Sequence, residues 1–177
     1  ADYYVRTSHA GEVAFIEPEI EQRMRSLAQV ARAEFIRFER LVLDPRRPAV
    51  LLMARENLKD HRGVLPAIGE LYQRGTGDPP AIWVSEAVAD LYGFRPGMRM
   101  TLPLSGRPAE FVVEAVWRDY ARQHGSILVD RADYQRLTGD RRANDAALWL
   151  RPGFDLAGLA DALRALPGGD RFDMADP

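Results

Sequence analysis

Residues 83–151 decide the fold, and they read WVSEAVADLYGFRPGMRMTLPLSGRPAEFVVEAVWRDYARQHGSILVDRADYQRLTGDRRANDAALWLR. A short helical pattern runs into a Gly-x-x-Pro-Gly turn, and two strands with alternating apolar residues follow. A third strand ends in an aspartate, and a short helix and another strand come after it. This order describes a layout of elements rather than a reaction centre.

The first helix of this stretch has a recognisable start and end. Ser85 precedes it and is expected to cap it, because a serine hydroxyl accepts a backbone N–H of the first turn. Gly93 suits the left-handed residue that ends a helix. Pro96 and Gly97 then predict a turn in which the glycine takes a positive φ.

Two alternating segments follow the turn. Apolar residues stand at every second position in residues 98–104 and again in residues 111–117, with a turn at residues 105–108 between them. This alternation is typical of half-buried strands. The two segments predict a small, strongly bent β unit.

The strand of residues 126–129 ends at Asp130, which is expected to cap a short helix closed by Gly139. Asp133 stands three residues further on, as in an approximate capping box. The two carboxylates are also candidates for an acid/base pair. Helix capping explains their spacing without chemistry.

The first 80 residues predict a strand, a helix, a long hairpin and a second helix. A linker rich in glycine and proline follows at residues 75–80, where we expect a boundary between two lobes. The second helix is predicted because apolar residues recur there at helical spacing. The predicted ranges are Tyr3–Thr7 for the strand, a helix opened by Pro18, Ala33–Leu43 and Ala49–Ala54 for the hairpin, and His61–Tyr72 for the second helix.

The C-terminal part predicts a strand at residues 146–150, a helix capped by Asp155 and a last strand at residues 171–174. The chain begins and ends with strand and helix patterns, so we expect its two ends to close one lobe together. The fold class is α+β, in two lobes. Lobe one, residues 1–79 and 145–177, is a sheet with packed helices. Lobe two, residues 80–144, holds the small bent β unit.

Composition narrows the function. The net charge is −2 and the pI is near 6.0, which disfavours a nucleic-acid binder. The chain has no cysteine, so disulfides, thiol catalysis and cysteine-based metal sites are excluded. No run of 18 apolar residues is present. The chain starts as though a strand were already under way, which is typical of a piece of a larger protein.

Three histidines and one polar loop are the candidates for chemistry. His9 and His61 lie near acidic residues, but no two histidines stand at metal-ligand spacing, so no metal or cofactor is expected. The loop of residues 119–126 holds Asp119, His124 and Ser126. These are the residue types of a hydrolase, but a Gly-x-Ser-x-Gly elbow is missing, and local hydrogen bonding accounts for them better.

Two further groups are interpreted structurally. Trp83, Trp117 and Trp149 all fall in strand-like runs and are expected in the core or at a lobe junction rather than around a ligand. The arginines of residues 131–142 form a modest basic group that we expect on the solvated surface, with contact to acidic lipid head groups as the functional alternative. Its members are Arg131, Arg136, Arg141 and Arg142.

With these residues laid out, residues 82–97 resemble an element of FtsX-like, MacB-type ABC transporter permeases. In that family a small strand, Val-Ser-Glu, a helix and Gly-Leu-x-Pro-Gly recur in the large domain outside the membrane. Residues 111–120 resemble the family's next strand, and residues 127–139 its strand-Asp-helix step. The likeness covers residues 82–166 well. It marks Ser85, Gly93, Pro96, Gly97 and Asp130 as residues of the pattern.

The resemblance implies a domain held between two membrane helices of a bacterial permease, on the periplasmic side of the inner membrane. Such a permease pairs with a second copy and with a cytoplasmic ATPase, and its outer domain relays motion to a substrate or partner. Lipids, lipoproteins and peptides are the cargoes implied. The resemblance implies neither a cofactor nor catalysis in this domain, and no nucleic acid as partner.

Two other readings stay open at this stage. One is a free-standing ligand-binding or regulatory module built on a small β-barrel. The other is a small hydrolase that uses Asp119, His124 and Ser126.

Overall fold

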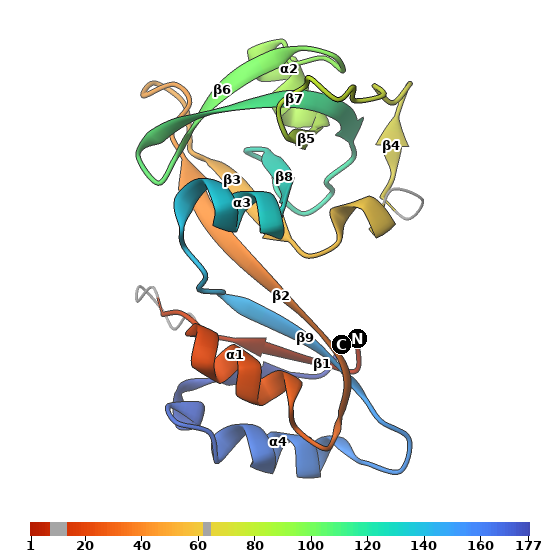
Figure 1. Cartoon of the computed structure of the whole chain (residues 1–177), viewed down its shortest axis with the longest axis vertical. Helices are drawn as coiled ribbons and strands as arrows, with labels where there is room; N and C mark the ends of the chain where they lie inside the picture. Colours follow the sequence, from red (N-terminus) through yellow and green to blue (C-terminus); the bar gives the residue numbers. More distant parts are fainter. Residues whose placement is uncertain (8–13, 62–64) are drawn as a thin grey trace. The chain divides into compact units, whose positions relative to one another are not determined.

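The computed structural model describes residues 1–7, 14–61 and 65–177, without the side chain of His61. Its four α-helices and ten strands make an α+β fold, as predicted, and they divide into two compact units (Figure 1). Unit 1 comprises residues 1–37 and 141–177, and unit 2 comprises residues 38–140. Among the described residues, no helix has the length and hydrophobicity that crossing a bilayer requires.

Unit 1 is an antiparallel sheet with two helices. Strand β1 pairs with both β9 and β10, so strands from the two ends of the chain lie side by side, as predicted. The sheet order is β10 (Asp173–Ala175), β1 (Tyr3–Arg6), β9 (Asp145–Leu150) and β2 (Val30–Leu41). The helices are α1 (Pro18–Arg25), α4 (Leu156–Arg164) and the 3₁₀ turn η2 (Gly169–Arg171).

One face of this sheet is covered by both helices. Val5 pairs with Ala146, which in turn pairs with Phe35, so these side chains point to the same face. Met24 of α1 and Leu163 of α4 belong to the same buried cluster. Unit 1 therefore has two layers, with its core between the sheet and the helices.

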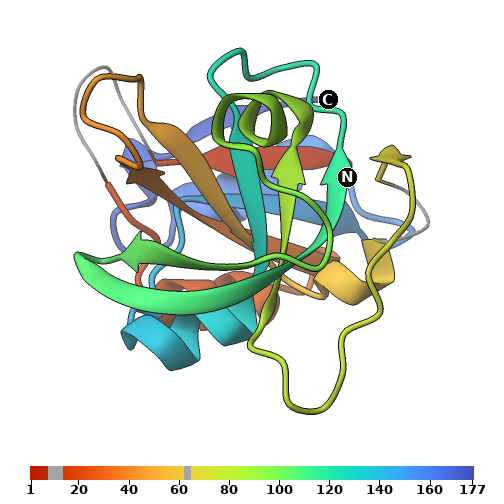
Figure 2. The same ribbon diagram turned by 90° about the horizontal axis from the view of Figure 1, so that it is seen from above.

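Unit 2 is a mixed sheet that also begins with β2. After β2 come β3 (Val50–Arg55), β8 (Ser126–Asp130), β5 (Ala81–Ser85), β7 (Arg107–Trp117) and β4 (Ala67–Ile68). Strand β6 (Arg99–Leu104) pairs with β7 as a long curved hairpin (Figure 2). Helices α2 (Glu86–Tyr92) and α3 (Arg131–Thr138) and the 3₁₀ turn η1 (Leu58–His61) complete the unit.

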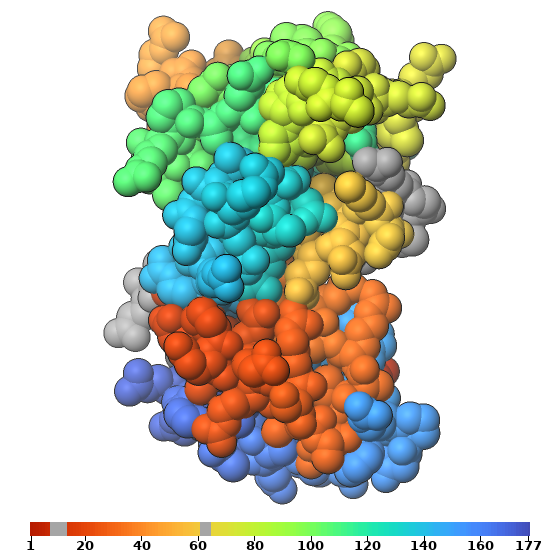
Figure 3. Space-filling view, viewed as in Figure 1, coloured from red at the N-terminus to blue at the C-terminus, as the bar shows by residue number. Residues whose placement is uncertain are grey.

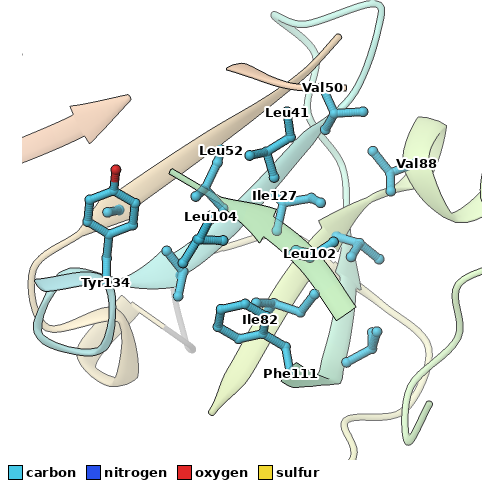
Figure 4. Packing of buried hydrophobic residues seen from close by; sticks show 14 residues of the cluster. Leu41, Val50, Leu52, Ile82, Val88, Leu102, Leu104, Phe111, Ile127 and Tyr134 are labelled. Carbon is cyan, nitrogen blue, oxygen red and sulfur yellow. The ribbon is translucent and has the colours of Figure 1, made fainter. Parts of the chain in front are cut away.

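The core of unit 2 lies under the β6–β7 hairpin. Leu102 and Leu104 of the hairpin pack into one buried cluster with Leu52 and Ile127 of the sheet (Figure 4). Tyr134 of α3 is fully buried in the same cluster. The curved β6–β7 hairpin is the small, strongly bent β unit that the alternating residues predict.

A bulge in β7 changes which residues face the core. Ile82 pairs with Val113, but the next residue, Trp83, pairs with Ala115, so Glu114 is an extra residue in β7. Val113 belongs to the main cluster, whereas Trp117 is buried outside it. The predicted alternation over residues 111–117 is therefore interrupted at the bulge.

The predicted helix over residues 61–72 is wrong. Residues 62–64 lie outside the described residues, and Ala67 and Ile68 form β4, which pairs with the end of β7. Tyr72 donates its backbone N–H to the carbonyl of Glu114 at 2.8 Å. The segment instead satisfies the edge of β7, and Gly69, with φ 73°, is unsuited to a helix interior.

The lobe boundary predicted at residues 79 and 80 falls inside unit 2. Strand β3 pairs with β8, and β4 pairs with β7, so strands from before the predicted boundary share a sheet with strands from after it. The C-terminal boundary lies at Asp140 and Arg141, four residues before the predicted one.

Candidate functional site

Ser85 links two segments of unit 2. Its hydroxyl oxygen accepts the backbone N–H of Val88 at 3.4 Å, which caps α2, and that of Ser126 at 3.0 Å. The serine is almost fully buried. Gly93, at the end of α2, and Gly97, in the following turn, take φ values of 72° and 90°. These backbone roles are the ones that the sequence predicts.

Asp130 and Asp133 do not act as a pair. Asp130 accepts the backbone N–H of Ala132 at 2.9 Å, which caps α3, and that of Leu58 at 3.1 Å. Asp133 instead forms an ion pair with Arg136 at 2.9 Å. Asp130 therefore joins η1 to the start of α3, which is a structural task.

The loop of residues 119–126 does not assemble a catalytic relay. Ser126 donates its hydroxyl directly to Asp119 at 2.7 Å, and Asp119 also pairs with Arg122 at 3.2 Å. A serine nucleophile needs the histidine between itself and the acid. Within the described residues His124 makes no hydrogen bond, and Asp119 and Ser126 brace the loop without it.

A cleft of about 480 Å³ opens in unit 2 between η1, the start of α3 and residues 71–74. We call it the Trp83 cleft. Figure 3 shows the surface formed here by η1, in gold, and α3, in cyan. Its size lies in the range of small-ligand pockets. Its wall carries three acidic residues and two basic ones: Glu114, Asp130, Asp133, Lys59 and Arg74.

The inner wall of the cleft is a buried polar pair. The indole Nε1 of Trp83 donates to Oε1 of Glu114 at 3.0 Å, and both side chains are buried. The bulge in β7 sets this contact by placing the extra residue Glu114 beside Trp83. A carboxylate is rarely this buried without partners.

The outer wall is held by a polar cluster around Asp78. Asp78 Oδ2 accepts the hydroxyl of Tyr72 at 2.7 Å and the backbone N–H of Gly75 at 2.8 Å, and Oδ1 pairs with Arg99 at 3.0 Å. The bond from Gly75 leads the causes that lower the pKa of Asp78, and the bond to Asp78 raises the pKa of Tyr72. The cluster fixes residues 72–78 as an ordered loop.

The cleft offers a polar wall of mixed charge to which a polar group could bind. The described lining of the cleft includes no serine, threonine or histidine, and Glu114 and Asp130 already accept hydrogen bonds. Neither the Trp83–Glu114 pair nor the cluster around Asp78 could be predicted from the sequence, because a bulge and an irregular loop bring their residues together. In the sequence, Asp78 looks like an ordinary polar residue of a loop, and Glu114 looks like an ordinary polar residue of a strand.

One predicted surface group is partly wrong. Arg131 is only 3% exposed and lies 3.7 Å from Glu56, so it is a buried ion-pair partner. Arg136 is exposed, as predicted. In unit 1, the guanidinium of Arg142 lies over the ring of Phe15 at 3.8 Å.

The aromatic and histidine predictions have mixed outcomes. Trp83 and Trp117 are buried in unit 2, as predicted, while Trp149 of unit 1 is partly exposed beneath Arg32, whose guanidinium lies 4.4 Å from the ring centre. His9 and the side chain of His61 lie outside the described part of the chain.

No protein-family profile and no curated protein matches the chain by sequence. Solved structures share its fold. The periplasmic region of MacB from Actinobacillus actinomycetemcomitans matches with a TM-score of 0.64 at 11% identity, over 98% of this chain and 87% of that one. The extracellular domain of the noncanonic ABC-type transporter YknZ from Gram-positive bacteria matches with a TM-score of 0.62 at 10% identity, over 98% of each chain. The chain therefore has the fold of these periplasmic and extracellular transporter domains, as the sequence resemblance predicts.

Proposed function

We propose that residues 1–177 form a single extracytoplasmic domain of a bacterial ABC transporter permease. The observation that carries the proposal is the length of the structural likeness, which covers 98% of this chain against both MacB and YknZ. Both units take part in the match, so it is not confined to one common motif. At 10–11% identity the likeness supports the fold and the class of protein, and the relay role is part of our proposal.

In this role the domain relays ATP-driven motion of the membrane helices to a substrate or a partner. It sits on the periplasmic side of the inner membrane, in a permease that pairs with a second copy and a cytoplasmic ATPase. The cargo is a lipid, lipoprotein or peptide, and nucleic acid is no partner. The domain itself performs no catalysis. Five residues of the family motif have structural roles in this domain: Ser85, Gly93, Pro96, Gly97 and Asp130.

The location is testable by cysteine labelling, because the chain contains no cysteine of its own. Tyr120 is 84% exposed, so Tyr120→Cys in the full-length protein presents an accessible thiol. We expect a membrane-impermeant maleimide to label it in intact cells once the outer membrane, where present, is permeabilised. Labelling only after lysis of the cytoplasmic membrane would contradict the proposal.

Two controls make this result specific. Val113 is fully buried, so Val113→Cys should label only in denaturant. A cysteine placed in the partner ATPase should label only after lysis. The absence of catalysis has its own test: reproducible hydrolase turnover by the purified chain, abolished by His124→Ala, would overturn that part of the proposal.

A further inference from the structure

A second hollow in unit 2 has a different charge character from the Trp83 cleft. It is an open depression of about 580 Å³ between the end of β2, the start of β3 and the loop of residues 121–125. Arg40, Arg122 and His124 line it, and no acidic residue is among the described residues of its wall. We call it the Arg40 hollow.

Only some of the polar side chains that line this hollow make hydrogen bonds or ion pairs within the protein. Arg122 is balanced by Asp119 at 3.2 Å. In the described part of the chain, neither the guanidinium of Arg40 nor the imidazole of His124 makes a hydrogen bond or an ion pair. A cation and a polar ring from two separate segments thus share one hollow without a partner.

The loop that carries His124 is firmly held. Asp119 accepts the hydroxyl of Ser126 at 2.7 Å and the backbone N–H of Ala121 at 2.9 Å. The carbonyl of Gly125 accepts the backbone N–H of Leu51 at 3.2 Å, which ties the loop to β3. Asp119 and Ser126, which do not form a catalytic relay with His124, therefore brace one wall of the hollow.

We propose that the Arg40 hollow binds a phosphate ester, with the phosphate beside Arg40 and His124. A guanidinium is a strong partner for phosphate because its charge-assisted N–H groups match the oxygens of the anion. Pro48, Ala49 and Leu51 add an apolar part to the lining of the hollow. It accommodates the organic part of the ester, since the volume exceeds that of a bare phosphate ion. The source is either a small soluble ester or the head group of a lipid.

The test uses a titration of the chain with glycerol 3-phosphate, followed by amide shifts in ¹H–¹⁵N spectra. We expect saturable shifts at Gly125 and Leu51. Arg40→Gln and His124→Gln should each weaken binding about tenfold, as the loss of one charge-assisted contact implies. The matched control is Arg107→Gln, which removes the same charge from an exposed residue of β7 outside the hollow.

A second arm distinguishes the two sources. Sedimentation with phosphatidylglycerol vesicles, against phosphatidylcholine vesicles, reports head-group binding. Binding of either probe that Arg40→Gln weakens and Arg107→Gln leaves within about twofold supports the site and names its source. Equal weakening by the two variants, or no saturable binding in either arm, would overturn it. Thermal unfolding of each variant confirms that it is folded. The proposal stands apart from the transporter assignment, because neither arm involves transport.

Discussion

The indole N–H of Trp83 and the carboxylate of Glu114 form a buried hydrogen bond of 3.0 Å across neighbouring strands β5 and β7. The pair exists because β7 carries one more residue than β5 at this point. It forms the inner wall of the Trp83 cleft. Because both groups are buried, the indole N–H depends on this carboxylate for its hydrogen-bond acceptor.

The first prediction concerns this pair. Trp83→Phe removes the N–H donor and leaves one oxygen of Glu114 without it. We expect a loss of about 2–3 kcal/mol in the free energy of unfolding, because the bond involves a buried, charged acceptor. Urea denaturation measures the loss, and a double-mutant cycle with Glu114→Leu, which removes the acceptor, isolates the coupling. Trp149→Phe, at a partly exposed indole, is the control and should cost less. Equal costs would show that the hydrogen bond contributes little.

Ser85 should matter more than an ordinary helix cap. Ser85→Ala removes the acceptor of two buried backbone N–H groups, those of Val88 and Ser126. We expect destabilisation by about 2–3 kcal/mol. Asp155 caps α4 through a single, exposed bond to Gly158 at 2.8 Å, so Asp155→Ala should cost about 1 kcal/mol. Thermal or urea unfolding compares the two, and an equal or reversed order would contradict the two-bond role of Ser85.

Gly125 is the glycine whose replacement should be most informative in unit 2. Its φ is 96°, and an added Cβ would lie 2.5 Å from Cγ2 of Val88. Gly139 also has a positive φ, of 72°, but an added Cβ there meets nothing within 4 Å. We therefore expect Gly125→Ala to cost about 2–3 kcal/mol and Gly139→Ala about 1 kcal/mol.

The overlap itself has a direct check. Shortening Val88 to Ala in the Gly125→Ala background should restore part of the loss, so the two substitutions should be less than additive. Strict additivity in urea unfolding would show that the methyl group of Val88 is not the obstacle.

Asp145 predicts a pH dependence of stability. Burial at the start of β9 raises the pKa of this carboxyl to about 6, although the neighbouring Arg6 opposes the shift. The folded state thus holds the proton more tightly than the unfolded state does. The contribution of Asp145 to stability is therefore most favourable below about pH 4, falls as pH rises towards 6, and stays unfavourable above it.

Asp145→Asn removes this titration. Above pH 6 we expect the variant to be more stable than the parent by about 1–2 kcal/mol, a value that allows for solvent screening of the partly exposed carboxylate. Thermal unfolding between about pH 4 and pH 7.5 gives both curves. A constant difference at every pH would mean that Asp145 is not the titrating group.

Local signals explain what the sequence could predict. Ser85, Gly93, Asp130 and Gly139 mark helix ends through their own backbone and side-chain chemistry, and the structure places helix ends at all four. The apolar alternation of residues 98–104 likewise predicts β6, because it depends only on neighbours along the strand.

The remaining features depend on residues far apart in the chain. The apolar residues between positions 64 and 72 have helical spacing. The described part of this segment instead forms β4 and an extended stretch, both hydrogen-bonded to the edge of β7. The burial of Arg131 depends on Glu56, and the Trp83 cleft depends on a bulge. Tertiary pairing overrides local preference at each of these points.

The most direct test of the proposed relay is a distance between the two copies of the permease in the assembled transporter. A spin label attached at Tyr120→Cys, on an exposed loop, reports that distance by pulsed electron paramagnetic resonance. We predict that it shifts between the nucleotide-free state and the ATP-bound state of a hydrolysis-deficient transporter. An unchanged distance distribution, in a sample shown to bind ATP, would contradict the claim that this domain relays ATP-driven motion.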